Sequence, residues 1–423
     1  MEITNKAMAD IAAACKEASR RAARLTTAEK NCVLHMIADH LEHDWQEIFI
    51  ANARDVEDGQ KKGLSPAMID RLVLNESRLA GMAKAIREIA TLHDPVGEMS
   101  EMRTRPNGIQ VGMMRIPLGV ISIIYESRPN VTSDAAALCL KAGNAVLLRG
   151  GSEAFHSNQA IVNSMHRAMQ AAGLPQEIVS FVPTTDRAVL QELLKLDQYI
   201  DLVIPRGGEG LIRFVVENSR IPVIKHYKGV CHLYVDKDAD QEMAVNLLID
   251  GKTSRPGVCN ALETLLVHRD IAARFLPKAA AALHKKNVEI HGCAETAALV
   301  SGVVPATEDD YYAEYLALII AIRVVPDVEA AVAHIEKYGS EHTDVIVTDS
   351  LQAAQKFVRE VNSSVVAVNA SSRFSDGGEL GLGAEIGIST TKLHAFGPMG
   401  LEALTTRKFV ITGDGQTRHK VEI

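Results

Sequence analysis

The stretch GVISIIYESRPNVTSDAAALCLKAGNAVLLRGG, residues 119–151, shows the pattern that decides the fold. A short apolar run precedes a helical segment, and a second apolar run follows. The alternation continues to about residue 227, which predicts a parallel sheet covered by helices on both faces. Such sheets bind ligands at the carboxyl ends of their strands, where YESRPN (125–130), RGGSE (149–153) and IPRGGEG (204–210) fall.

The remaining segments predict two further parts. With 423 residues, the chain exceeds the roughly 250 to 300 residues at which single cores stop growing. Residues 98–117 predict a hairpin, and the tail, 391–423, alternates like an edge strand. We expect an α/β domain at 1–97 and 118–231, a second at 232–390, and a small β element made of the hairpin and tail. Because this element has little core of its own, we predict a homo-oligomer.

Composition excludes several classes of function. The net charge of −8 gives no electrostatic reason to expect nucleic acid or an anionic membrane as partner. No apolar run approaches the roughly 18 residues of a membrane span, and the first residues lack a signal-peptide pattern. We therefore expect a cytoplasmic protein. The six cysteines are scattered, without the spacing of a metal site, so we expect reduced thiols and no bound metal.

One of these cysteines stands apart from the others. In SRPGVCN, residues 254–260, Cys259 follows a Pro-Gly turn between a predicted helix and a predicted strand. It is either a small packing residue, as we expect for most of the other thiols, or a nucleophile. Arg255 favours the second reading, because a cation stabilises a thiolate and a loop leaves backbone N–H groups for an oxyanion.

The tripeptide Ser-Arg-Pro occurs twice, at 127–129 and at 254–256. If both copies lie in one cleft, Arg128 and Arg255 suit an anionic substrate, and otherwise they are solvated surface. The glycines of RGGSE and IPRGGEG admit a phosphate at a helix start, although helix capping explains them equally well.

Taken in order, five segments carry a resemblance to a known family: YESRPNVT (125–132), KAGNAVLLRGGSEA (141–154), IPRGG (204–208), SRPGVCNALET (254–264) and HIEKYGSEHTDVI (334–346). Together they resemble the γ-glutamyl phosphate reductase family of the aldehyde dehydrogenase superfamily. The resemblance implies a Rossmann-like dinucleotide-binding domain, a catalytic α/β domain and a β oligomerisation element. It also implies NADPH-dependent reduction of L-glutamyl 5-phosphate to glutamate 5-semialdehyde, the second step from glutamate to proline, and makes association with glutamate 5-kinase plausible.

The resemblance also assigns roles to residues. Cys259 matches the nucleophile, and Ser127 or Asn130 matches the side chain that assists the oxyanion. Glu314 matches the glutamate that holds the nicotinamide ribose, and Arg149 stands where a cation favours the 2′-phosphate of NADP. The remaining cofactor candidates are Gly150, Gly151, Ser152, Arg206, Gly207 and Gly208, and the candidates for substrate binding are Arg128, Arg255, Lys228 and His342.

One departure from the superfamily bears on the reaction. Hydrolytic aldehyde dehydrogenases carry a Glu-Leu-Gly-Gly segment with a water-activating glutamate, and IKHYKGV, residues 224–230, stands in its place. A reductase must keep water from its thioester, so loss of that base favours reduction. The alternatives are a hydrolytic enzyme of the same fold with another base, and a catalytically silent binding protein.

Overall fold

The computed structural model describes residues 5–419 and separates them into two units. The first unit comprises the residues up to Ile224, together with Leu382–Gly387 and the residues from Met399 onward. The second comprises Lys225–Gly381 and Ile388–Pro398. Residues 225–231, which we expected in the first domain, therefore belong to the second unit. Within the described residues, no helix is long and apolar enough to cross a membrane.

The first unit is built on a four-stranded parallel sheet with the strand order β5-β4-β3-β6. Every residue of β3 and β4 is buried, because helices cover the sheet. Its strands are β3 (Val120–Tyr125), β4 (Ala145–Gly150), β5 (Val179–Phe181) and β6 (Leu202–Arg206). Its helices are α1 (Asn5–Ala22), α2 (Thr27–His43), α3 (Trp45–Lys61), α4 (Pro66–Leu72), α5 (Glu76–Thr91), α6 (Pro129–Lys141), α7 (Phe155–Ala171), α8 (Arg187–Leu193) and α9 (Glu209–Asn218).

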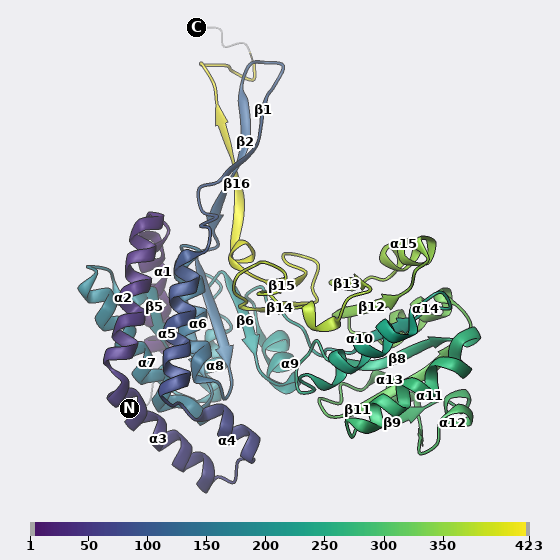
Figure 1. The fold of residues 1–423 in the computed structure, drawn as a ribbon. Coiled ribbons are helices and arrows are strands. Elements are labelled where there is room, and N and C mark those ends of the chain that lie inside the picture. The colour runs from purple at the N-terminus through teal and green to yellow at the C-terminus, as the bar shows by residue number, and fades with distance from the viewer. Residues whose placement is uncertain (1–4, 420–423) are drawn as a thin grey trace. The chain divides into compact units, whose positions relative to one another are not determined.

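A separate antiparallel sheet of the first unit joins distant parts of the sequence. The hairpin strands β1 (Met99–Thr104) and β2 (Gln110–Pro117) pair with each other, and β2 also pairs with β16 (Thr405–Thr412). Figure 1 shows these three strands as a long, narrow sheet that extends away from the helices of the unit.

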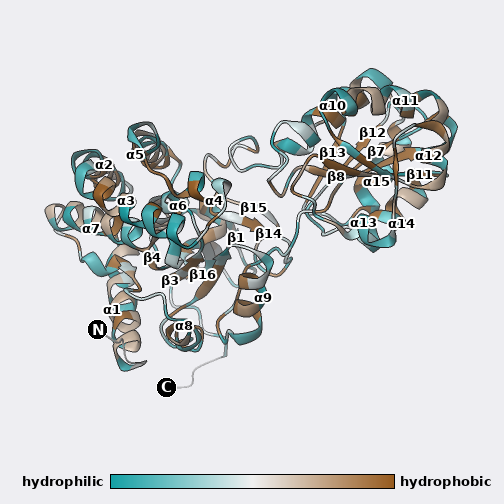
Figure 2. Cartoon of the chain, turned by 90° about the horizontal axis from the view of Figure 1, so that it is seen from below, coloured by the Kyte–Doolittle hydropathy of each residue, from teal (hydrophilic) through white to brown (hydrophobic). Residues whose placement is uncertain are grey.

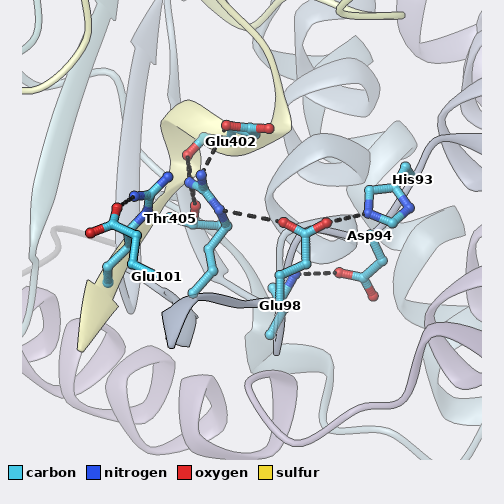
Figure 3. A network of polar contacts seen from close by, with 9 residues as sticks. His93, Asp94, Glu98, Glu101, Glu402 and Thr405 are labelled. Carbon is cyan, nitrogen blue, oxygen red and sulfur yellow. Dashed lines mark hydrogen bonds and ion pairs between the residues drawn. The ribbon is translucent and has the colours of Figure 1, made fainter. Parts of the chain in front are cut away.

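Arg115 of β2 holds the base of this sheet. Its guanidinium donates to Thr405 Oγ1 at 2.9 Å and pairs with Glu402 at 2.9 Å and with Glu98 at 3.9 Å. Figure 3 shows Glu98, Glu402 and Thr405 gathered in this network. The contacts tie β2 both to the start of β16 and to the segment that precedes β1.

The second unit is a seven-stranded parallel sheet with the order β10-β9-β11-β8-β7-β12-β13. Its strands are β7 (Cys231–Val235), β8 (Leu262–His268), β9 (Glu289–Gly292), β10 (Val304–Pro305), β11 (Ile319–Val325), β12 (Thr343–Val347) and β13 (Val365–Val368). Its helices are α10 (Gln241–Thr253), α11 (Arg269–Lys285), α12 (Ala294–Leu299), α13 (Glu308–Tyr312), α14 (Val328–Tyr338) and α15 (Leu351–Glu360). A two-stranded sheet of β14 (Gly387–Ser389) and β15 (Gly397–Met399) lies where the chain passes between the units.

The core of the second unit has two layers, one on each face of the sheet. Leu233 and Val235 of β7 pack with residues of α10 and α11, whereas Tyr234 between them packs with residues of α14 and α15. Successive strand residues point to opposite faces, so a strand covered on both sides is apolar throughout. Figure 2 shows the brown strands of this unit enclosed between helices.

A buried ion pair fixes the helical part of the first unit. Lys30 of α2 donates to both carboxylate oxygens of Asp94, at 2.9 and 3.2 Å, and both side chains are almost fully buried. Asp94 also accepts hydrogen bonds from the Thr27 hydroxyl and the Val96 N–H. Both oxygens of the Asp94 carboxylate thus accept hydrogen bonds, and Lys30 is the cation that compensates its charge.

We predict that Lys30→Met destabilises the first unit by about 3 to 5 kcal/mol, because Asp94 is left as an uncompensated buried charge. Arg20→Met is the control, since the Arg20–Glu17 pair is exposed and such pairs contribute about 0 to 1 kcal/mol. Urea unfolding followed by the fluorescence of Trp45, the single tryptophan, measures both. Equal losses in the two variants would contradict the assignment.

Candidate active site

Cys259 lies in a turn that joins the end of α10 to the start of β8, and it is partly exposed. The next residue, Asn260, anchors the turn. Its side-chain amide donates to the Ser375 carbonyl at 2.9 Å, and its carbonyl accepts from the Ser372 hydroxyl at 2.7 Å. The thiol therefore sits on a held backbone rather than within the core.

Gly229 packs directly against this turn. A Cβ atom at Gly229 would lie 2.0 Å from the carbonyl oxygen of Cys259, so only glycine fits. The Gly229 N–H donates to Glu314 Oε1 at 2.9 Å, and Cys231 Sγ donates to the Cys259 carbonyl at 3.2 Å. Gly229 thus contacts both Cys259 and Glu314, two of the predicted site residues.

A fully buried ion pair, Lys252 with Glu263, joins the two elements that flank the Cys259 turn. Lys252 Nζ of α10 lies 2.6 Å from Glu263 Oε2 of β8. The other oxygen of Glu263 accepts from the N–H of Leu316, two residues beyond Glu314. Burial raises the pKa of Glu263 to about 7 and lowers the pKa of Lys252. The pair therefore ties both ends of the turn to the segment that carries Glu314.

This pair was not predicted from the sequence. Lys252 and Glu263 stand on either side of the quoted segment SRPGVCN. The available signal was a charged residue near the end of the helix and another inside an apolar strand, with the turn between them. A charge within an otherwise apolar strand needs a buried partner.

The remaining predicted residues of the second unit differ in exposure. Arg255 is exposed beside the turn, and Lys228 is partly buried next to Gly229. His342 is fully buried, and burial, followed by the charge of His226, lowers its pKa to about 3. A neutral, buried ring offers no positive charge to a phosphate, and a role of His342 in substrate binding stays a prediction.

In the first unit, the carboxyl ends of β3 and β6 carry a connected group of predicted residues. The Glu126 N–H donates to the Arg206 carbonyl at 3.1 Å, and the Glu126 carboxylate accepts from the Gly208 N–H at 3.0 Å. Ser127 has a positive φ of 45°, an uncommon conformation for a residue other than glycine. Residues in such conformations are frequent at functional sites, which supports the prediction that Ser127 is a functional residue.

Asn130 is already engaged by its own helix. Its amide nitrogen donates to Asp134 Oδ2 at 2.9 Å, which uses one of its two N–H groups. Burial raises the pKa of Asp134 to about 6. Asn130 therefore has one side-chain N–H left for an oxyanion. Ser127, the other candidate, lies just after the end of β3.

Packing explains two of the predicted phosphate-binding glycines. A Cβ atom at Gly150 would lie 2.2 Å from Asn158 Nδ2, and one at Gly207 would lie 2.3 Å from Glu126 Oε2. Gly208, which caps α9, has open space around the same position. Of the three, Gly208 leaves room for a ligand to approach the helix start, while Ser152 and Gly151 begin the turn after β4.

Arg149, at the end of β4, is a buried cation with only 7% of its surface exposed. Burial lowers its pKa, and the nearby Glu153 and Glu126 act in the opposite direction. Its Nη2 donates to the Thr185 carbonyl at 2.8 Å, and its Nε has no hydrogen-bond partner in the part of the chain that the structure describes. The described residues also contain no cluster of side chains that could hold a metal ion.

Comparison with known proteins identifies the family. Residues 1–301 match the model of the aldehyde dehydrogenase family. The γ-glutamyl phosphate reductase of Salinibacter ruber is 64% identical over 97% of this chain and 94% of that protein. The one from Geotalea daltonii is 60% identical over 96% and 98%. The chain belongs to the γ-glutamyl phosphate reductase family.

Solved structures agree with this membership in the aldehyde dehydrogenase fold. The crystal structure of γ-glutamyl phosphate reductase from Thermotoga maritima matches with a TM-score of 0.96 and 47% identity, over 97% of this chain and all of that one. An acetylating aldehyde dehydrogenase from Geobacillus thermoglucosidasius matches with a TM-score of 0.68 at 18% identity, over 98% of each chain. The predicted family and fold class are confirmed.

We predict that Gly229→Ala displaces the Cys259 turn, because the new methyl group would overlap the Cys259 carbonyl. The alkylation rate of Cys259 by iodoacetamide, measured by peptide mass spectrometry, should change by about tenfold or more. Gly257→Ala is the matched control in the same turn, since its Cβ would meet no atom closer than 3.9 Å. An unchanged rate in Gly229→Ala would show that the close approach does not position the thiol.

Proposed function

We propose that this protein reduces L-glutamyl 5-phosphate to L-glutamate 5-semialdehyde with NADPH and releases phosphate, the second step from glutamate to proline. The names of its relatives support the substrate, and family membership supports a nicotinamide cofactor. The observation that carries the proposal is the contact of Gly229 with both the Cys259 backbone and the Glu314 carboxylate. It holds a candidate nucleophile and a candidate ribose ligand in one place.

The covalent step uses residues of this chain alone. The Cys259 thiolate attacks the acyl carbon, the C–O bond to phosphate breaks, and a thioester forms. The Cys259 N–H, with Ser127 or the remaining N–H of Asn130, stabilises the negative oxygen of the tetrahedral intermediate. Arg128, Arg255 and Lys228 are the cations we assign to the substrate's phosphate and carboxylate.

The thioester must then be protected from water. The segment 224–230 contains no carboxylate, and its Lys225 donates to the Tyr227 hydroxyl at 3.0 Å. Without a carboxylate base to activate water there, hydrolysis is slow, which favours reduction over the hydrolytic alternative.

The residues predicted to bind the cofactor are suited to the phosphates of a dinucleotide. When bound, the nicotinamide cofactor supplies the hydride. The orphaned Nε of Arg149 is a donor for a phosphate oxygen, and a permanently charged guanidinium favours NADPH over NADH. The start of α9 at Gly208 leaves room for a phosphate to approach, although the Gly208 N–H itself donates to Glu126. Arg206 and Ser152 flank these positions, and Glu314 would accept hydrogen bonds from ribose hydroxyls.

We predict that Cys259→Ala lowers phosphate-dependent oxidation of glutamate 5-semialdehyde by at least about 10³-fold, because the covalent route is lost. Cys32→Ala, which removes an exposed thiol, should retain full activity. The ultraviolet absorbance of the reduced cofactor measures both, with NADP or NAD.

Retained activity in Cys259→Ala would rule out the covalent mechanism. Oxidation that needs no phosphate would favour the hydrolytic alternative. If the wild type does not turn over the cofactor at all, the result would favour a catalytically silent binding protein.

The β1-β2-β16 sheet supports a homo-oligomer. Phe409 and Ile411 of β16 are the cross-strand partners of Met113 and Val111 of β2, so all four lie on the same face of the sheet. Phe409 is 71% exposed. An apolar sheet face of this kind fits a second copy of the chain. A cytoplasmic location and association with glutamate 5-kinase stay predictions.

We predict that Phe409→Asp shifts the wild-type assembly to a smaller species in sedimentation velocity, because a charge replaces the apolar contact. Leu393→Asp is the control, since Leu393 is 92% exposed and lies outside the three-stranded sheet. Sedimentation of the wild type as a monomer at micromolar concentration would remove the proposal.

A further inference from the structure

A second candidate binding site lies at the other end of the catalytic sheet from Cys259. A cavity of about 650 Å³ is lined by Arg269, which follows β8, by Cys293, which follows β9, and by Arg323 near the end of β11. The carboxyl ends of parallel strands are the usual place for ligands in open α/β sheets. Cys259 and Gly229, by contrast, precede β8 and β7 and so lie at the amino ends.

The charges around this cavity are unequally compensated. Lys337 of α14 pairs with Glu308 at 2.5 Å, so its charge is balanced. Arg269 and Arg323 form no ion pair within the described residues, and Arg323 lies over the ring of Tyr311, 5.4 Å from its centre. Glu295 and Glu308 also line the cavity and act on these charges from beyond ion-pair distance, Glu295 on both arginines and Glu308 on Arg323.

A buried histidine adds an unused donor to the same wall. His334 of α14 is 4% exposed, and its Nδ1 accepts a hydrogen bond from Arg323 Nη1 at 3.2 Å. The ring proton must then be on Nε2, and this atom has no partner among the described residues. Burial, followed by the charges of His232 and Arg323, lowers the pKa of His334 to about 2, so the ring is neutral.

An unpaired buried donor beside two arginines that form no ion pair within the described residues points to one class of ligand. Guanidinium groups bind the oxygens of phosphates and carboxylates through paired hydrogen bonds, and a neutral imidazole N–H adds a third donor. A cation or an apolar molecule would leave the arginines and the His334 N–H unsatisfied.

We propose that the cavity binds a small oxyanion, a phosphate or a carboxylate, held by Arg269 and Arg323 with the N–H of His334. The site does not depend on the proposed reaction. Because it lies at the carboxyl ends of the strands, its ligand does not compete with a substrate at Cys259.

Equilibrium dialysis with radiolabelled inorganic phosphate, and separately with L-glutamate, tests the proposal. Arg269→Gln and Arg323→Gln should weaken binding of the anion by about tenfold or more, since each removes a charged hydrogen-bond donor. Arg274→Gln is the matched control, because Arg274 is an exposed arginine of α11 outside the cavity. Circular dichroism checks that each variant is folded. Because Arg269 is exposed, its substitution should leave the core of the second unit unchanged.

The number of bound ions separates this site from the proposed active site, which also takes phosphate. Wild type and Arg274→Gln should bind one more phosphate or glutamate per chain than Arg269→Gln and Arg323→Gln. Loss confined to phosphate or to glutamate identifies the ligand class. Equal numbers and affinities for both anions in all four proteins would overturn the proposal. Failure of the proposed function would instead lower the count equally in all four.

Discussion

The close contact between Gly229 and the carbonyl of Cys259 is the constraint on which the candidate active site depends. With no side chain at Gly229, the segment before β7 packs backbone to backbone against the turn before β8. The same residue then directs its N–H to Glu314. The buried Lys252–Glu263 pair holds the elements on both sides of that turn. Breaking such a pair leaves a buried charge, so the turn resists rearrangement.

The strand-helix alternation predicted the two parallel sheets because strands covered on both faces must be apolar throughout. It gave no strand order, since β9 and β8 lie on either side of β11 although β11 follows both in the chain. The two units divide after Ile224, before the predicted boundary at residue 231, and residues 225–231 join the second unit through contacts such as Gly229 with Cys259.

The candidate site was predictable where local chemistry marks it. The Pro-Gly turn singled out Cys259, and the family resemblance added Glu314. Burial was the quantity that the sequence lacked. Lys252 is an ordinary helix lysine by sequence, and only the structure places Glu263 opposite it. His342 was predicted as a substrate-binding residue, and only the structure shows that its ring is buried. The assignment of Arg149 stays a prediction, although an orphaned buried guanidinium nitrogen agrees with an anionic ligand.

The position of Cys259 at the amino ends of the strands of the second unit has an electrostatic consequence. The turn follows the carboxyl end of α10, where the helix dipole is negative and disfavours a thiolate. In the proposed mechanism, Arg255 and Lys228, the cations on the two segments that meet at this turn, supply the opposing charge. At the carboxyl ends of the same strands, Arg269 and Arg323 line the second cavity together with Cys293, Glu295 and Glu308. In the two proposals, one sheet therefore carries cations at both ends, near the proposed covalent intermediate at one end and near the proposed anion at the other.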